Sequence, residues 1–176
     1  NNFLKIENEK LRSLIDENIK SNEILAKVII DKESPFLKSV VLNKGTKDNV
    51  KIVMAILDGV YLVGQIIEVN YTNSRALLLS DLNSKIPSVL EPNNIQVVIS
   101  GTGGNNGIIE HTKDDLKEYF ENNKIIAYTS GLGGIFKPGI PIGKMTKDQP
   151  EEVIFFSDFT QLNYVKIVSY KVGGEK

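Results

Sequence analysis

The chain has 176 residues, of which 41% are hydrophobic and 24% are charged, and its formal net charge at pH 7 is -1. These values are ordinary for a globular protein of one large or two small domains, and the lack of a basic surplus argues against a nucleic-acid partner. Because the sequence contains no cysteine, disulfides, thiolate metal sites and cysteine nucleophiles are excluded.

The first predicted element is an amphipathic helix over residues 2–20. Its narrow apolar seam has heptad spacing and consists of Leu4, Leu11, Leu14 and Asn18. Two interpretations are open: a helix lying on its own domain, or the end of a coiled coil in which an Asn at an a position fixes the register of a dimer. About two heptads are present, whereas three or four identify a coiled coil. Because the sequence opens inside this pattern and has no apolar run of about 18 residues, we expect a membrane anchor upstream.

Short β-branched runs then replace the helical pattern. In the first half they lie at residues 26–31, 39–43, 61–69 and 75–79, and in the second half at 95–100, 107–110, 125–129, 140–145, 153–156 and 164–168. Because no long helix separates them, strands this short and this closely spaced predict small barrels. The exception is residues 112–122, where Leu116, Tyr119 and Phe120 have the spacing of a short surface helix.

The apolar pattern lapses at Leu90-Glu91-Pro92-Asn93-Asn94, which predicts a domain boundary. The expected organisation is mainly β: a coiled-coil helix over residues 1–22, a first six-stranded barrel over 23–93, a second over 94–170 and a tail over 171–176. The last strand, at 164–168, fits either barrel. Both halves contain a strand crossed by a glycine, at Val63-Gly64 and at Ile142-Gly143, so we interpret them as two related barrels.

The densest glycine and proline segment is Thr129-Ser130-Gly131-Leu132-Gly133-Gly134-Ile135-Phe136-Lys137-Pro138-Gly139-Ile140-Pro141-Ile142-Gly143. Neither a helix nor an uninterrupted strand tolerates this density, so we expect tight turns in which backbone passes very close to other backbone. Two segments resemble phosphate cradles. Residues 101–107 have Asn106 where a dinucleotide fingerprint needs glycine, and the segment ending in Gly143 has Met145 where a P-loop needs a hydroxyl. Both fail, and no nucleotide cofactor is predicted.

Catalytic candidates are equally weak. His111 is the single histidine, so any metal site or histidine base would depend on it alone. Ser130 precedes Gly131 outside a Gly-x-Ser-x-Gly setting, and Asp81 or Asp158 would meet His111 only by chance. We therefore predict no catalytic, metal or cofactor site and no enzyme. An inactive or cryptic chymotrypsin-like hydrolase, which also has tandem six-stranded barrels, and a ligand-binding barrel module are the alternatives.

The glycine-rich segment closely resembles the signature of the MreC family of bacterial rod shape-determining proteins. Residues 42–50, 62–69 and 74–81 resemble further blocks of this family in the same order, so the resemblance runs from the helix to about Val168. The matching motif residues are Gly45, Gly64, Gly131, Gly133, Gly134, Phe136, Pro138, Gly139 and Gly143. The family usually has glycine where Asn49 and Val53 stand. Because Asn tolerates a left-handed backbone and Val does not, the resemblance does not carry over to the turn at Val53.

The resemblance implies a non-enzymatic scaffold without a cofactor. Its parts would be a membrane anchor that this chain lacks, a coiled coil that dimerises through the heptad seam, and two barrels at the extracytoplasmic (periplasmic) face of the bacterial inner membrane. The implied partners are a second copy, in some relatives extended to a filament, together with MreD, RodA, a class B penicillin-binding protein and, indirectly, MreB. Such a protein links the MreB cytoskeleton to the peptidoglycan synthases of cell elongation and maintains cell shape.

Overall fold

The computed structural model describes Asn2 and residues 4–8, 19–29, 38–110, 124–146 and 148–172. These residues form a mainly β architecture with two short 3₁₀ turns, η1 (Thr46–Asp48) and η3 (Leu132–Gly134). The strands are β1 (Ile19–Ile29), β2 (Ser39–Leu42), β3 (Ala55–Asp58), β4 (Tyr61–Val69), β5 (Ser74–Leu78), β6 (Lys85–Glu91), β7 (Ile95–Gly101), β8 (Asn106–Glu110), β9 (Ile125–Thr129), β10 (Pro141–Thr146), β11 (Gln149–Phe155) and β12 (Tyr164–Val172). Across the described part of the chain, no helix has the length and apolarity needed to cross a membrane.

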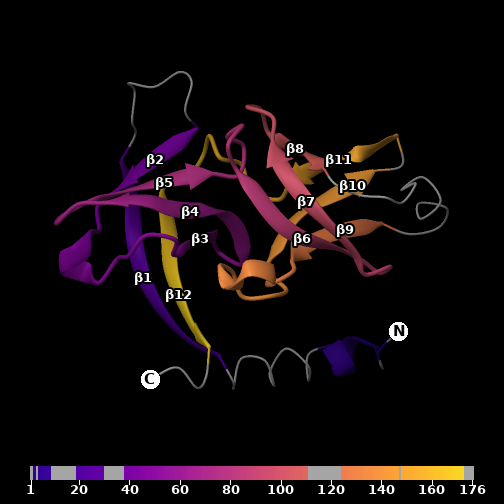
Figure 1. The fold of residues 1–176 in the computed structure, drawn as a ribbon, viewed down its shortest axis with the longest axis horizontal. Coiled ribbons are helices and arrows are strands. Elements are labelled where there is room, and N and C mark those ends of the chain that lie inside the picture. The colour runs from indigo at the N-terminus through magenta and orange to yellow at the C-terminus, as the bar shows by residue number, and fades with distance from the viewer. Residues whose placement is uncertain are drawn as a thin grey trace.

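The strands form two closed barrels of six strands each, which lie side by side (Figure 1). The first barrel has the order β1-β12-β3-β4-β5-β2, and the second has the order β10-β11-β8-β7-β6-β9. Closure gives every strand two neighbours, which is how small barrels avoid long free sheet edges. The prediction of two six-stranded barrels is confirmed.

Aliphatic side chains fill the interior of the first barrel. Leu42, Ile56, Ile66 and Ile167 are each exposed by 1% or less and belong to one cluster with the other inward-facing residues of this barrel. Along the strands, buried positions alternate with more exposed ones, because successive side chains of a strand point to opposite faces of the sheet. The interior is therefore a packed core, as in other small barrels.

The structure locates the passage between the barrels elsewhere than the sequence predicts. Strand β6, which lies inside the predicted first barrel (residues 23–93), pairs with β7 and β9 of the second barrel. The chain crosses between the barrels at residues 79–84, where Leu79, Asp81 and Ser84 are buried. Residues 91–94, where the apolar pattern lapses, instead form the turn of the β6–β7 hairpin, with Leu90 opposite Ile95. The crossing contains polar residues, but it is so short that it resembles an ordinary turn between strands.

Strand β12 returns to the first barrel, where it pairs with β1 and β3. The predicted range of the second barrel, residues 94–170, therefore contains one strand that belongs to the first. The predicted tail also begins too early, because β12 continues to Val172 and residues 173–176 lie outside the described part of the chain.

The two barrels share one pairing pattern when β12 is counted before β1. In that order each barrel consists of two successive three-stranded groups, β12-β1-β2 with β3-β4-β5 in the first barrel and β6-β7-β8 with β9-β10-β11 in the second. The groups are joined through β12–β3 and β2–β5 in the first barrel, and through β6–β9 and β8–β11 in the second. The barrels are thus related by a one-strand circular permutation, which agrees with the interpretation of a repeat.

A second apolar cluster joins the barrels to each other. It contains Ala55, Leu57 and Leu62 of the first barrel together with residues of the second, such as Ile142 and Val153. Phe159, in the connection from β11 to β12, packs against both clusters of the molecule. A ring contact between Tyr61 and Phe156, with centroids 4.9 Å apart, adds to the junction. The barrels therefore form one packed body.

The N-terminal part agrees with the sequence prediction only in part. Asn2 and residues 4–8 are helical, and Leu4 is 56% exposed. The other seam residues, Leu11, Leu14 and Asn18, lie outside the described residues, as do the predicted helix at 112–122 and the segment that contains His111. Strand β1 begins at Ile19, so the predicted helical element at 1–22 extends too far. The coiled coil stays a prediction.

The turn at Val53 forms although its sequence disfavours it. Met54 N–H donates to the carbonyl of Lys51 at 3.4 Å, and Val53 N–H donates to the carbonyl of Ile66 at 2.8 Å. Val53 has a φ of 76°, and Asn49 has a φ of 67°. A left-handed conformation is ordinary for Asn, whereas for a β-branched residue it is a strained outlier. The backbone hydrogen bonds hold Val53 in this conformation.

We predict that Val53→Gly raises the free energy of unfolding by about 1 kcal/mol. Relief of roughly 1–3 kcal/mol of backbone strain exceeds the roughly 0.5–1 kcal/mol that glycine loses in chain entropy. Urea denaturation of the purified chain measures the change. Val60→Gly is the matched control, because Val60 is also an exposed turn valine (65%) but has no left-handed backbone. This control is expected to lose stability, and an equal loss in both variants contradicts the strain at Val53.

A candidate interaction site at the barrel junction

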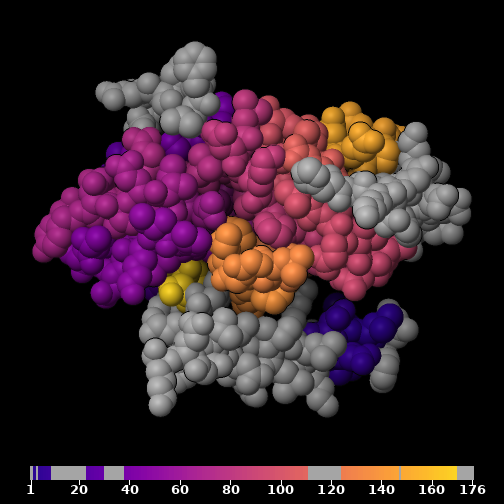
Figure 2. Space-filling view, viewed as in Figure 1, coloured from indigo at the N-terminus to yellow at the C-terminus, as the bar shows by residue number. Residues whose placement is uncertain are grey.

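The glycine-rich segment connects β9 to β10 and lies where the two barrels meet. In Figure 1 its turn η3 lies at the centre of the molecule, and Figure 2 shows the same orange segment on the surface between the purple first barrel and the pink second barrel. Its backbone is a series of tight turns, with positive φ angles at Gly131, Gly133, Gly134 and Gly139. The predicted turns are therefore present, and they form a compact loop on the surface of the junction.

Thr129, the last residue of β9, closes the base of this loop. Its hydroxyl donates to the carbonyl of Lys137 at 2.6 Å and accepts the N–H of Ile140 at 2.9 Å. Its backbone N–H donates to the Ile140 carbonyl, and its carbonyl accepts the N–H of Gly139, both at 2.9 Å. The side chain is fully buried, so these hydrogen bonds are shielded from competing water. They fix the two ends of the loop against each other.

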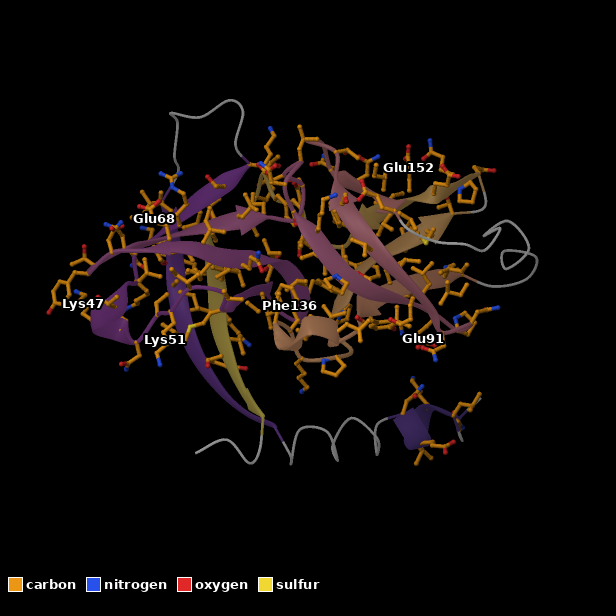
Figure 3. All side chains as sticks on the ribbon, viewed as in Figure 1. Lys47, Lys51, Glu68, Glu91, Phe136 and Glu152 are labelled. Atoms are coloured by element: carbon orange, nitrogen blue, oxygen red, sulfur yellow. The ribbon has the colours of Figure 1, made fainter. Side chains whose placement is uncertain are left out.

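Phe136 anchors the middle of the loop. It is 6% exposed and belongs to the apolar cluster that joins the barrels, and Figure 3 shows it at the junction between them. The neighbouring Ile135 is 39% exposed, and Leu132, in η3, is 59% exposed. With its base closed and its middle anchored, the loop presents these two apolar side chains to solvent on a fixed backbone. An arrangement of this kind is suited to docking a partner.

The glycines of the loop are needed for different reasons, either space beside the Cα atom or a left-handed backbone. A Cβ at Gly131 would lie 2.9 Å from Cγ of Pro138, so this position needs both space and a left-handed backbone. At Gly133, Gly134 and Gly139 nothing lies within 4 Å of an added Cβ. The expectation that the backbone passes very close to other backbone is therefore wrong for these three positions. Their positive φ angles alone explain the glycines.

The expectation is confirmed at Gly143, the last residue of the segment, where backbone does pass close to backbone, as it also does at Gly64 of the first barrel. An added Cβ would lie 2.1 Å from the carbonyl oxygen of Leu77 at Gly64, and 2.3 Å from that of Ile154 at Gly143. In both strands the residue before the glycine forms a β-bulge against the preceding strand. The two glycines occupy equivalent positions in the permuted barrels, because each bends the middle strand of its second three-stranded group. Gly45, also in the family motif, packs as tightly against the hairpin at residues 70–73.

The described residues contain no set of three or more His, Asp and Glu side chains that could hold a metal. The serine and aspartates weighed as triad members have structural partners. The Ser130 hydroxyl accepts the N–H of Leu132 at 3.3 Å, and the Asp81 carboxylate accepts the N–H groups of Lys38 and Asn83 at 2.9 and 2.8 Å. Hydrogen bonds from the Thr160 hydroxyl and backbone lower the pKa of Asp158. These geometries support no catalytic role.

Two structural residues of the junction were missed by sequence reasoning. Thr129 is the clamp of the glycine-rich loop, and Asp81 holds the inter-barrel crossing to Lys38, beside the start of β2. Each is a small polar residue at the end of an apolar strand, which is the only local signal that the sequence carries. The Asp81 bond joins residues 43 apart in sequence, and the Thr129 bonds span 8 and 11 residues across the loop, so both roles become visible only in the folded chain.

A family model described as "Rod shape-determining protein MreC, barrel core" matches residues 28–169. Cell shape-determining protein MreC of Haemophilus influenzae is 33% identical over 79% of this chain, and that of Cereibacter sphaeroides is 30% identical over 85%. The chain spans only 40% and 49% of the lengths of these two relatives.

Solved structures show the same fold at lower identity. MreC of Listeria monocytogenes has a TM-score of 0.74 at 23% identity, and the match covers 98% of this chain and 87% of that one. A complex between penicillin-binding protein PBP2 and MreC from Helicobacter pylori matches with a TM-score of 0.57 at 14% identity, covering 84% of this chain and 98% of that one.

We predict that Gly64→Ala and Gly143→Ala each lower the free energy of unfolding by about 3 kcal/mol or more, because the methyl group meets a neighbouring strand's backbone. Gly133→Ala should lower it by about 1–2 kcal/mol, since only the left-handed backbone opposes it. Urea denaturation of the three variants measures the difference. If Gly133→Ala and Gly143→Ala lower the free energy of unfolding equally, then Gly143 is not required for the close approach of the strands.

Proposed function

This chain belongs to the MreC family of rod shape-determining proteins, and from this premise we propose that it is the barrel region of a non-enzymatic scaffold of cell elongation. The scaffold links the MreB cytoskeleton to peptidoglycan synthases and so maintains cell shape. The observation that carries the proposal is the loop at the barrel junction, which holds Leu132 and Ile135 exposed while Phe136 anchors it in the shared core. A docking surface needs fixed apolar side chains of this kind and no catalytic group.

The partner with most support is a class B penicillin-binding protein. The Helicobacter pylori protein of similar fold was solved in complex with PBP2. In this chain, Leu132 and Ile135 would supply the central apolar contact, with the barrels on both sides forming a more polar rim. RodA and MreD would belong to the same assembly, and MreB would be reached indirectly through the membrane. This arrangement requires the barrels at the extracytoplasmic face of the inner membrane, with an anchor preceding them.

Dimerisation is the second part of the proposal. Leu4, Leu11, Leu14 and Asn18 would form the seam of a coiled coil between two copies. Leu4 is exposed in the described helical residues, which leaves it available for a partner helix. The motif glycines do not touch a partner in this scheme, because their role is to shape the two barrels.

We predict that the double variant Leu132→Ser and Ile135→Ser loses most of its binding to a class B penicillin-binding protein. Loss of the two anchors should weaken binding at least tenfold, since buried apolar anchors contribute about 1 kcal/mol or more each. Biolayer interferometry with the purified extracytoplasmic domain of the synthase measures the affinity.

Leu25→Ser is the matched control, because Leu25 is as exposed (63%) but lies on β1, in the first barrel. It should bind as the unaltered chain does. Thermal melting of all variants separates folding from binding. If the double variant folds normally and binds with unchanged affinity, the loop is not the docking site.

We also predict that deletion of residues 1–18 shifts the mass measured by analytical ultracentrifugation from dimer toward monomer. The deletion removes the seam and leaves β1 intact from Ile19. Leu11→Ser with Leu14→Ser should have the same effect, whereas Glu9→Ser with Asp16→Ser, at the outward-facing f positions of the same heptads, should not. A mass unaffected by the deletion rules out the seam.

A further inference from the structure

An apolar turn stands exposed at one end of the first barrel. Ile52 and Val53 form the tip of the turn between η1 and β3, and they are 60% and 42% exposed. The left-handed position of such a turn ordinarily holds glycine, yet here it holds a strained valine with a φ of 76°. Backbone strain at an exposed residue that gains no packing from it is typical of a functional surface.

The barrel topology brings further exposed groups to the same end. Ala55 of β3 pairs with Gln65 of β4, so β4 runs on past the start of β3 to Val69 and its hairpin with β5 lies at the same end of the barrel as the turn at Ile52. The turn η1 precedes Ile52 in the chain and lies against this hairpin. They are tied together, since Lys47 N–H donates to the carbonyl of Tyr71 at 3.1 Å. The Tyr71 side chain is 71% exposed, which adds an aromatic ring to the apolar tips.

This end of the barrel also carries an excess of positive charge. Lys44, Lys47 and Lys51 come from the same segment, and among the described residues no carboxylate forms an ion pair with any of them. Figure 3 shows Lys47 and Lys51 at the end away from the second barrel. Of the nearby acids, Glu68 lies 3.9 Å from Arg75. The Asp48 carboxylate accepts the N–H of Gly45 at 3.1 Å and keeps its negative charge, but the three lysines outnumber it. In a chain with a net charge of -1, this is a local basic surface.

We propose that this end patch docks on the surface of an anionic lipid bilayer. The patch consists of Lys44, Lys47, Lys51, Ile52, Val53 and Tyr71. These residues lie on turns at the end of the barrel, and exposed turn side chains can enter the headgroup region of a bilayer. Apolar tips then insert, tyrosine lies at the interface, and lysines bind acidic headgroups while their aliphatic stems lie along the apolar layer.

The path of the chain fits this orientation. Strands β1 and β12 continue past the pair Val168–Ala55 to the pair Ile19–Val172, so β1 enters the barrel from the end that carries the patch. The first described residue of β1, Ile19, therefore lies at this end of the barrel. In the cell, the binding of the patch to a bilayer rests on the proposed function, because the proposed membrane anchor would hold the patch at a high effective concentration near the bilayer. The affinity of the patch for lipid does not depend on the anchor, so it can be measured with the purified chain.

Co-sedimentation of the purified chain with large vesicles tests the proposal. Vesicles of equal parts phosphatidylglycerol and phosphatidylethanolamine should bind it at low ionic strength, and vesicles of phosphatidylcholine should not. Binding should disappear at about 1 M salt, where the screening length is about 3 Å. Lys47→Gln with Lys51→Gln should lower the partition coefficient about 30-fold, given about 1 kcal/mol per lysine. Ile52→Ser should lower it further.

The matched controls are Lys124→Gln with Lys144→Gln, which remove two exposed lysines of the second barrel, and Val60→Ser, at the opposite end of the first barrel. Both should bind vesicles normally. The proposal is overturned if anionic vesicles do not bind, or if control and patch variants lose binding equally. It is also overturned if the patch variants keep vesicle binding but lose synthase binding, because the patch then contacts an acidic protein. Synthase binding by the unaltered chain, measured separately, tests the proposed function independently.

Discussion

The apolar cluster between the barrels is the interaction on which the other features depend. A barrel strand normally buries one face and exposes the other, but Ala55, Leu57 and Leu62 lie on the outer side of the first barrel and are nevertheless buried against the second. Burial of apolar area stabilises by about 25 cal/mol per Å², so this face holds the barrels in one relative orientation. The glycine-rich loop is anchored in that cluster through Phe136. A surface that spans the junction is consequently as rigid as the barrels themselves.

A repeated backbone device shapes both barrels. In each, a bulge precedes a glycine in the middle strand of the second three-stranded group, and the adjacent strand's carbonyl occupies the space of the missing side chain. Bulges increase local twist, and glycine permits the close approach that follows. The two positions are equivalent only when β12 is counted as the first strand of its barrel. The repeat is therefore clearer in the strand pairing than in the sequence.

The sequence predicted the class of fold from short β-branched runs and turn residues, and it predicted the tight turns of the glycine-rich segment. It did not locate the passage between the barrels, because the short polar segment at 79–84 resembles an ordinary turn between strands, whereas the exposed hairpin turn at 91–94 resembles a linker. Nor could local patterns assign β12, since pairing with β1 depends on residues far apart in the chain. In the loop, glycine spacing indicated the turns, but the clamp at Thr129 acts through Lys137 and Ile140 and has no local pattern.

Because β12 returns to the first barrel, the two barrels are expected to close in a fixed order during folding. All six strands of the second barrel are consecutive in the chain, so their pairing with one another does not require β12. The first barrel holds the first five strands and must wait for β12, the final one, to close. Contacts between distant parts of a chain form slowly, because a long loop must be ordered first. The barrel nearest the N-terminus is therefore the one completed last, and loss of a few C-terminal residues would damage the N-terminal barrel rather than its neighbour.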